Sequence, residues 1–136
     1  MLFVVDANVV ISSMIKKGTT FEVFKHNAFV KQCEFIAPEF LFSEINMKRI
    51  YSLTKLSKEN VEKTFSLITE QIEFIPFSKF SDKLPEAMNI NFKDSPYLAL
   101  ALTYKCPIFS GDKGLKKQIK VKVFSPREVL GILGIN

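Results

Sequence analysis

Four acidic residues stand where the sequence predicts that a strand gives way to a helix, or soon after such a place. Asp6 directly follows the apolar run of residues 2–5. The other three are Glu44, Asp94 and Asp112. In a parallel sheet such turns open onto the carboxyl edge, where open α/β folds bind ligands, so acids far apart in sequence can converge there. Converged carboxylates repel one another unless protons or a cation neutralise them. A hard divalent ion with oxygen ligands, Mg²⁺ or Mn²⁺, is the expected cation, and it supports phosphoryl chemistry.

Two of these acids also have an ordinary explanation as helix caps. Asp6 could cap the helix near Val9, although Asn8 could serve equally well. A charged side chain at the end of a hydrophobic strand is costly to bury unless something pairs with it. Asp94 could also cap a helix, although Ser95 is available for that role. We favour a ligand role for both aspartates.

The other two acids are less informative when each is taken alone. Glu44 stands four residues before Lys48, the favourable order for an ion pair on a helix surface. Asp112 lies in the glycine-containing segment 110–114, where ordinary turn chemistry explains an aspartate about as well as function does. The set of four acids is therefore more specific than its members.

Short β-rich runs alternate with longer helical patterns, and this alternation predicts a three-layer α/β/α fold with a mainly parallel central sheet. The predicted strands are residues 2–5, 33–37, 72–76, 107–110 and 121–124. The predicted helices are residues 8–15, 19–31, 39–52, 58–71 and a short one at 126–130. In residues 78–90, Pro85 should kink a helix or mark a fresh start.

A further helix is predicted to begin at Asp94-Ser95-Pro96, because a capping residue precedes a proline in the first turn. Residues 97–102 are apolar on nearly all sides. This helix should therefore be buried against the sheet and should hold Asp94 in a fixed place.

The composition fits one globular domain over residues 1–136, because 47% of the side chains are hydrophobic and 24% are charged. Nineteen Lys and Arg against fourteen Asp and Glu leave a net charge of +5 at pH 7. A basic surface around an acidic pocket favours a polyanionic substrate. The alternative explanation of the net positive charge is a generic soluble surface.

Cys33 and Cys106 have neither zinc nor redox spacing, and a strand begins almost at Met1, where a signal peptide would stand. We expect buried, reduced thiols in a cytoplasmic protein. No apolar stretch nears the ~20 residues that cross a bilayer, so no membrane association is expected. The single histidine, His26, almost excludes a histidine-based catalytic dyad or zinc site.

Four parts of the chain together resemble the PIN-domain ribonucleases. These parts are Val4 to Asn8, Glu44 on a helix, Lys93 to Ala101, and Phe109 to Lys113. The resemblance covers essentially the whole chain in order and spacing, except around Pro85. It is a resemblance to small prokaryotic PIN proteins, many of them toxins of toxin–antitoxin pairs. It implies a central parallel sheet of about five strands, a homodimer, and an antitoxin protein as a possible partner.

Carried over to this sequence, the PIN resemblance implies an acidic metal pocket made by Asp6, Glu44, Asp94 and Asp112. It also implies that Asn8 and Ser110 support this pocket as neighbouring polar groups. Asp6 and Asp94 would bind Mg²⁺ or Mn²⁺ directly, and the other two acids directly or through water. The implied activity is metal-dependent hydrolysis of single-stranded RNA, in which the ion screens the phosphate and lowers the pKa of its bound water.

Basic residues close to these acids in sequence could hold the flanking phosphates of an RNA. They are Lys48, Arg49, Lys113, Lys116 and Lys117. A solvated helix face explains each of them at least as well.

Three other functions compete with a ribonuclease. A haloacid-dehalogenase-type phosphatase would need a second acid two residues after Asp6, where the chain has Asn8, which cannot act as a general acid. A signalling receiver would need paired acids early in the chain. An inactive RNA-binding or protein-interaction module could have the same fold, but the presence of all four acids argues against the loss of a catalytic pocket. The sequence does not separate a toxin from an RNA-processing enzyme.

Overall fold

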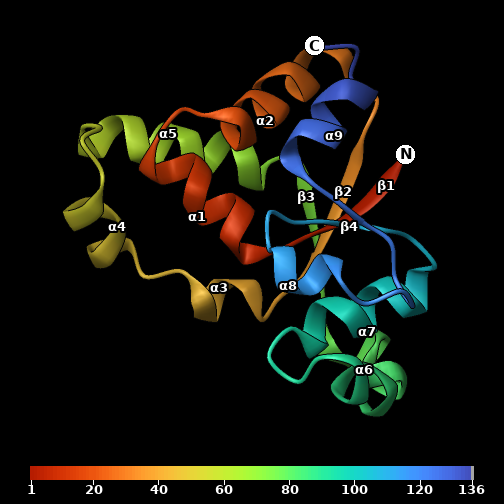
Figure 1. Cartoon of the computed structure of the whole chain (residues 1–136). Coiled ribbons are helices and arrows are strands. Elements are labelled where there is room, and N and C mark those ends of the chain that lie inside the picture. The colour runs from red at the N-terminus through yellow and green to blue at the C-terminus, as the bar shows by residue number, and fades with distance from the viewer. Residues whose placement is uncertain (136) are drawn as a thin grey trace.

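The computed structural model describes residues 1–135 and contains a five-stranded parallel sheet (Figure 1). The strands are β1 (Leu2–Val5), β2 (Glu34–Pro38), β3 (Ile72–Ile75), β4 (Ile108–Phe109) and β5 (Val123–Phe124). Their order across the sheet is β3-β2-β1-β4-β5, and every neighbouring pair is parallel. The predicted fold class is thereby confirmed, and each predicted strand is present, although β4 and β5 are shorter than expected.

The strand order places a topological switch point between β1 and β4. From β1 the chain steps outward to β2 and β3, then crosses back to β4 on the other side of β1, and continues to β5. At such a point the connections leave β1 and β4 in opposite directions, which opens a crevice at the carboxyl ends of these two strands. Asp6 follows β1, and Ser110 follows β4.

Helices cover both faces of the sheet (Figure 1). On one face lie α1 (Ala7–Ile15), α2 (Thr19–Val30), α5 (Lys58–Thr69) and α9 (Pro126–Ile132), which pack against one another. On the other face lie α6 (Leu84–Ile90) and α7 (Ser95–Tyr104). Crossover connections between parallel strands are right-handed, so the direction in which the chain steps across the sheet decides which face its helices cover. The steps from β1 to β2 and from β3 to β4 run in opposite directions, and their helices therefore lie on opposite faces.

The α7 helix forms the centre of its layer, packed against β1, β2 and β4. Its residues Leu98, Ala99 and Leu100 are completely buried. This burial was predicted from the apolar run, since a helix that is apolar on all sides must be covered on all sides. The helix runs back along the sheet from the carboxyl edge, and Asp94 therefore stands at that edge.

The predicted helix over residues 39–52 is wrong, because the structure divides it into α3 (Leu41–Glu44) and α4 (Met47–Leu53). Ile45 is extended between them, and the side chain of Asn46 accepts a hydrogen bond from the backbone N of Arg49 at 3.1 Å. An asparagine that caps a new helix in this way competes with continuation of the old one.

Two further segments refine the sequence-based expectations. Short 3-10 turns at Phe77–Lys79 and Ser81–Lys83 lead into α6, which has Pro85 in its first turn, so the proline marks a fresh start. A short helix, α8 (Lys113–Lys116), occupies what was expected to be only a turn.

The two cysteines are free, with Cys33 buried and Cys106 partly buried, and burial raises the pKa of Cys106 to about 11. Among the helices within residues 1–135, none is both long enough and apolar enough to cross a membrane.

Candidate functional site

Asp6 lies between β1 and α1, and only 3% of its surface is exposed. Its Oδ2 atom accepts a hydrogen bond from the Ser110 hydroxyl at 2.7 Å. Its Oδ1 atom accepts a long hydrogen bond of 3.4 Å from the backbone N of Asn8, so the carboxylate also caps α1 weakly. Burial is the main cause that raises the pKa of Asp6, and the charges of Glu44 and Asp112 add to the rise.

Ser110 connects Asp6 to the loop that carries Asp112. The backbone N of Asp112 donates to the Ser110 oxygen at 3.0 Å, while the hydroxyl of Ser110 donates to Asp6. This arrangement depends on the pairing of β1 with β4, in which the backbone N of Asp6 donates to the carbonyl oxygen of Phe109 at 3.1 Å. Residues 104 positions apart are thus in direct contact.

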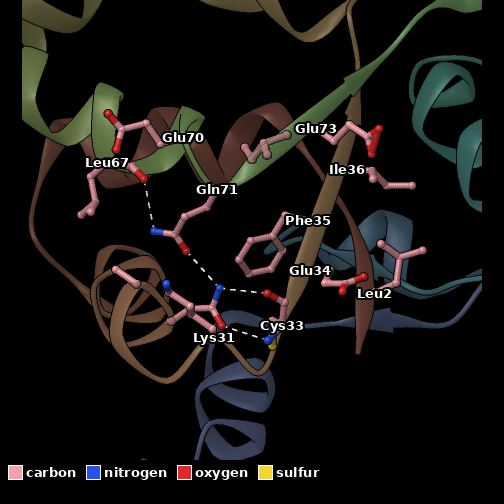
Figure 2. A pocket seen from close by; sticks show the side chains of 13 residues that line it. Leu2, Lys31, Cys33, Glu34, Phe35, Ile36, Leu67, Glu70, Gln71 and Glu73 are labelled. Carbon is pink, nitrogen blue, oxygen red and sulfur yellow. Dashed lines mark hydrogen bonds between the residues drawn. The ribbon is translucent and has the colours of Figure 1, made fainter.

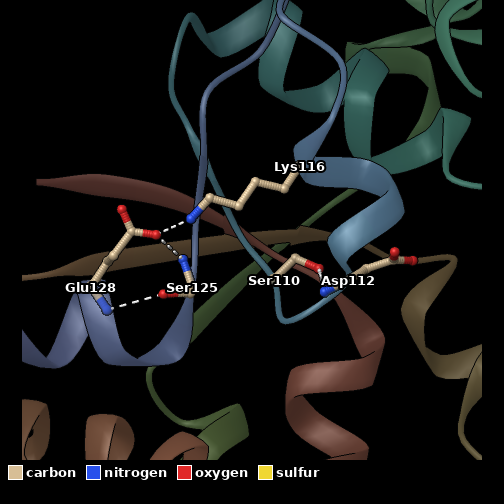
Figure 3. Close-up of polar contacts among 5 residues, drawn as sticks. All are labelled: Ser110, Asp112, Lys116, Ser125 and Glu128. Atoms are coloured by element: carbon tan, nitrogen blue, oxygen red, sulfur yellow. Dashed lines mark hydrogen bonds and ion pairs between the residues drawn. The ribbon is translucent and has the colours of Figure 1, made fainter.

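Asp112 caps a helix and also adds negative charge to the carboxyl edge. Its Oδ1 atom accepts hydrogen bonds from the backbone N of Gly114 at 2.8 Å and of Leu115 at 3.2 Å, which caps α8. Its negative charge also raises the pKa of both Asp6 and Asp94. Figure 3 shows its carboxylate on the side of the loop that faces away from Lys116. Capping therefore does not remove Asp112 from the acidic edge.

Asp94 precedes α7 and is 6% exposed, but its side chain makes no capping hydrogen bond. Its pKa is raised to about 6, chiefly by burial and then by the negative charges of Asp6, Asp112 and Glu44, with Lys93 acting in the opposite direction. The carboxyl edge thus carries more negative charge than it accommodates easily near neutral pH.

Glu44 stands at the end of α3 and accepts a hydrogen bond from the hydroxyl of Tyr97. Within the described part of the chain Glu44 forms no ion pair with Lys48, the ordinary alternative for this residue, because the helix is interrupted between them. Tyr97 was missed as a functional candidate. The available signal was its hydroxyl in an otherwise apolar helix, since a buried tyrosine hydroxyl usually needs a partner. Burial, followed by the contact with Glu44, raises the pKa of Tyr97.

The four acids act on one another electrostatically but do not close into a tight cluster. Within residues 1–135, no three acidic, histidine or cysteine side chains gather closely enough to form a ready-made metal cage. Mg²⁺ usually keeps several waters and takes only one or two carboxylates from the protein. An open edge with two buried aspartates and two more acids nearby has the donor chemistry for such an ion.

The remaining candidates surround this edge. Asn8 is exposed and lines a hollow of about 250 Å³ together with Gly111 and Asp112. Lys113 and Lys117 are exposed on and beside α8. Lys116 forms an ion pair with Glu128. In Figure 3 its side chain points towards Glu128 and away from the carboxylate of Asp112.

Lys48 and Arg49 are exposed in the first turn of α4, which lies beyond α3 and away from α8 in Figure 1. The basic candidates therefore form two separate groups rather than one patch.

Comparison with known proteins agrees with this architecture. The family model described as the PIN domain matches residues 4–124. A similar solved structure is the crystal structure of VapBC2 from Rickettsia felis bound to a DNA fragment from their promoter. The match has a TM-score of 0.63 and 13% sequence identity, and it covers 92% of this chain and 98% of that one, so it bears on the fold alone. No curated protein sequence matches the chain significantly.

Proposed function

Because the chain belongs to the PIN-domain family, we propose that it is a metal-dependent ribonuclease that hydrolyses phosphodiester bonds of single-stranded RNA. The observation that carries this proposal is the burial of Asp6 and Asp94 at the carboxyl edge, beside the switch point of the sheet. Burying two like charges together is costly, and such arrangements are concentrated at functional sites.

Asp6 and Asp94 would hold a Mg²⁺ or Mn²⁺ ion directly, and Glu44 and Asp112 would hold it directly or through water. When bound, such an ion would neutralise charge on the phosphate and lower the pKa of water. Burial is the main cause that raises the pKa of Asp94 to about 6, and the neighbouring negative charges that add to the rise are charges that a cation would balance. The donor set therefore fits a hard divalent ion.

The neighbouring polar groups would keep these carboxylates in place. Ser110 holds Oδ2 of Asp6, and its contact with the backbone of Asp112 limits how far that loop can move. Tyr97 holds one oxygen of Glu44. Asn8 would orient water or substrate in the hollow that it shares with Asp112. Groups that orient metal ligands commonly affect activity almost as much as the ligands themselves.

The basic side chains would hold the phosphates on either side of the cleaved bond. Lys113 and Lys117 would act near α8, and Lys48 and Arg49 near α4. Lys116 belongs to the same set, although its ion pair with Glu128 takes up part of its charge. Phosphate contacts of this kind position an RNA without reading its sequence.

The decisive experiment is cleavage of an unstructured RNA by purified protein with Mg²⁺ or Mn²⁺, and with EDTA. We expect cleavage with either ion and none with EDTA. Equal cleavage in EDTA would overturn the metal mechanism. If no cleavage occurs, a thermal shift with millimolar Mn²⁺ separates the alternatives, because an inactive binding module with a relic pocket should show no shift.

We further propose that the protein is the toxin of a toxin–antitoxin pair, acts in the cytoplasm and forms a homodimer. The fold likeness to a chain of the VapBC2 complex supports a protein partner. The test is whether the product of a neighbouring gene co-purifies with this chain and suppresses its cleavage of RNA. Cleavage that no neighbouring gene product inhibits would favour an RNA-processing enzyme.

A further inference from the structure

An exposed aromatic groove lies beside the N-terminus of α7. Its walls include the rings of Phe40, Phe77 and Phe92 and the side chain of Met88, and its volume is about 320 Å³. All four of these side chains are exposed, and Phe92 is exposed over 72% of its surface. Apolar side chains that gather in the open in this way usually mark a binding surface.

The aromatic groove includes residues that are next to Asp94 in the chain. Ser95 and Pro96 line the groove and directly follow Asp94, while Phe92 precedes that aspartate by two residues. The groove therefore begins at the first turn of α7, the helix that Asp94 precedes.

A second contact joins the groove to the acids through Phe40. The ring of Phe40 meets the ring of Tyr97 edge-on, with centroids 6.4 Å apart, and Tyr97 donates its hydroxyl hydrogen to Glu44. The groove and the acidic edge thus share α7 as a common wall.

The chemistry of the groove matches an unpaired nucleobase. Single-stranded nucleic acids bind by stacking bases on aromatic side chains while cations hold the backbone. The exposed Lys93 stands between Phe92 and Asp94, at the junction where a backbone would pass from groove to acids. Glu39 lines the groove and has a carboxylate that can accept a hydrogen bond from an exocyclic amino group of a base.

We propose that the aromatic groove is a base-binding subsite, which stacks one unpaired base of an RNA whose neighbouring phosphate lies at Asp94. This inference rests on the proposed ribonuclease function.

The test compares RNA binding by the wild-type protein and three variants. Phe92→Ala and Phe77→Ala each remove one exposed ring from the groove. Phe29→Ala is the matched control, because Phe29 is 83% exposed on α2 and does not line the groove. Binding of a short fluorescent single-stranded RNA is measured with Ca²⁺ in place of Mg²⁺, so that the RNA is held without rapid cleavage.

The two groove variants should bind the RNA about 5- to 150-fold more weakly than the wild type, the usual range for removing one base–aromatic stack. The control should bind it normally. An RNA with a single abasic position, moved along the strand, identifies the stacked base. At that position the wild type and Phe92→Ala should bind equally well, because there is no base left to stack.

Unchanged RNA affinity in both groove variants would overturn the subsite. If, in addition, Phe92→Ala alters the oligomeric mass in sedimentation, the groove is an interface between protein chains instead. The subsite would also be overturned if the groove variants lost the same amount of affinity for the intact RNA as for every abasic RNA.

These failures differ from failure of the proposed function. If the protein cleaves RNA with a metal ion but the groove variants bind RNA normally, only the proposed subsite is overturned. If binding depends on the stacked base but no metal-dependent cleavage occurs, only the proposed ribonuclease activity is overturned.

Discussion

The two edges of the central sheet both bury polar side chains, but they do so in opposite ways. At the amino edge, Asn27 donates to the carbonyl oxygen of Cys33 at 3.0 Å and accepts from its backbone N at 2.9 Å (Figure 2). Asn27 also donates to Gln71 at 3.0 Å, and Gln71 donates to the carbonyl oxygen of Phe24 at 2.9 Å. These groups are neutral, and they satisfy one another.

At the carboxyl edge the buried groups are carboxyl groups, which repel one another when they are ionised. Ser110 gives Asp6 one strong hydrogen bond, yet burial still raises the pKa of Asp6, and that of Asp94 reaches about 6. A neutral network stabilises a fold by itself, whereas a set of carboxylates needs protons or a cation. We therefore expect the amino edge to contribute to stability and the carboxyl edge to contribute to chemistry, and the following changes test that expectation.

Asp6→Asn should have the largest effect on activity. It removes one of the two buried charges proposed to hold the ion, so RNA cleavage with Mn²⁺ should fall at least ~100-fold, and Asp94→Asn should act similarly. The fold should survive, as circular dichroism melting will show. Glu70→Gln, an exposed acid near the amino edge, is the matched control. An Asp6→Asn protein that unfolds readily but keeps its specific activity would make Asp6 a structural cap.

Asn27→Ala should have the reverse outcome. It leaves the buried backbone groups of Cys33 without partners and should lower the free energy of unfolding by about 2 to 3 kcal/mol, measured by urea denaturation. Cleavage per folded molecule should stay unchanged. Asn60→Ala, at an exposed position of α5, should alter neither quantity. A stable Asn27→Ala protein would mean that the amino-edge network contributes little.

The metal-free protein should lose stability as the pH rises through the pKa of Asp94. Because this pKa is raised from 3.8 to about 6 in the folded state, protonation favours folding, and the stabilisation present at low pH is lost on ionisation. Asp94→Asn cannot ionise. In EDTA it should therefore melt a few degrees above the wild type at pH 8, and the gap should narrow towards pH 4.5. A gap of the same size at both pH values would mean that folding does not raise the pKa of Asp94.

Tyr97→Phe should have the smallest effect of the four changes. Glu44 is exposed, so water can replace the lost hydroxyl, and the free energy of unfolding should change by less than about 1 kcal/mol. If Tyr97 holds Glu44 for metal binding, the Mn²⁺ concentration needed for half-maximal cleavage should rise up to about tenfold. An unchanged Mn²⁺ requirement would leave this contact with a purely structural role.

Much of the fold follows from local patterns in the sequence. The strand β1 was predicted with its observed bounds, because a parallel strand covered on both faces must be a continuous apolar run. The burial of α7 followed from its apolar composition for the same reason. The helix break at Asn46 did not follow, because an asparagine inside an apolar helical pattern can either face solvent or cap a new helix.

For the candidate site, too, local sequence determined some features and the tertiary structure determined others. The sequence alone determined that Asp6 ends a buried strand and that Asp94 begins a buried helix, since each statement depends only on neighbouring residues. Only the tertiary structure decided that Ser110 reaches Asp6 across 104 residues and that Tyr97 reaches Glu44 across 53. Those contacts depend on which strands and helices become neighbours, and the periodicity of a single strand or helix carries no information about its neighbours.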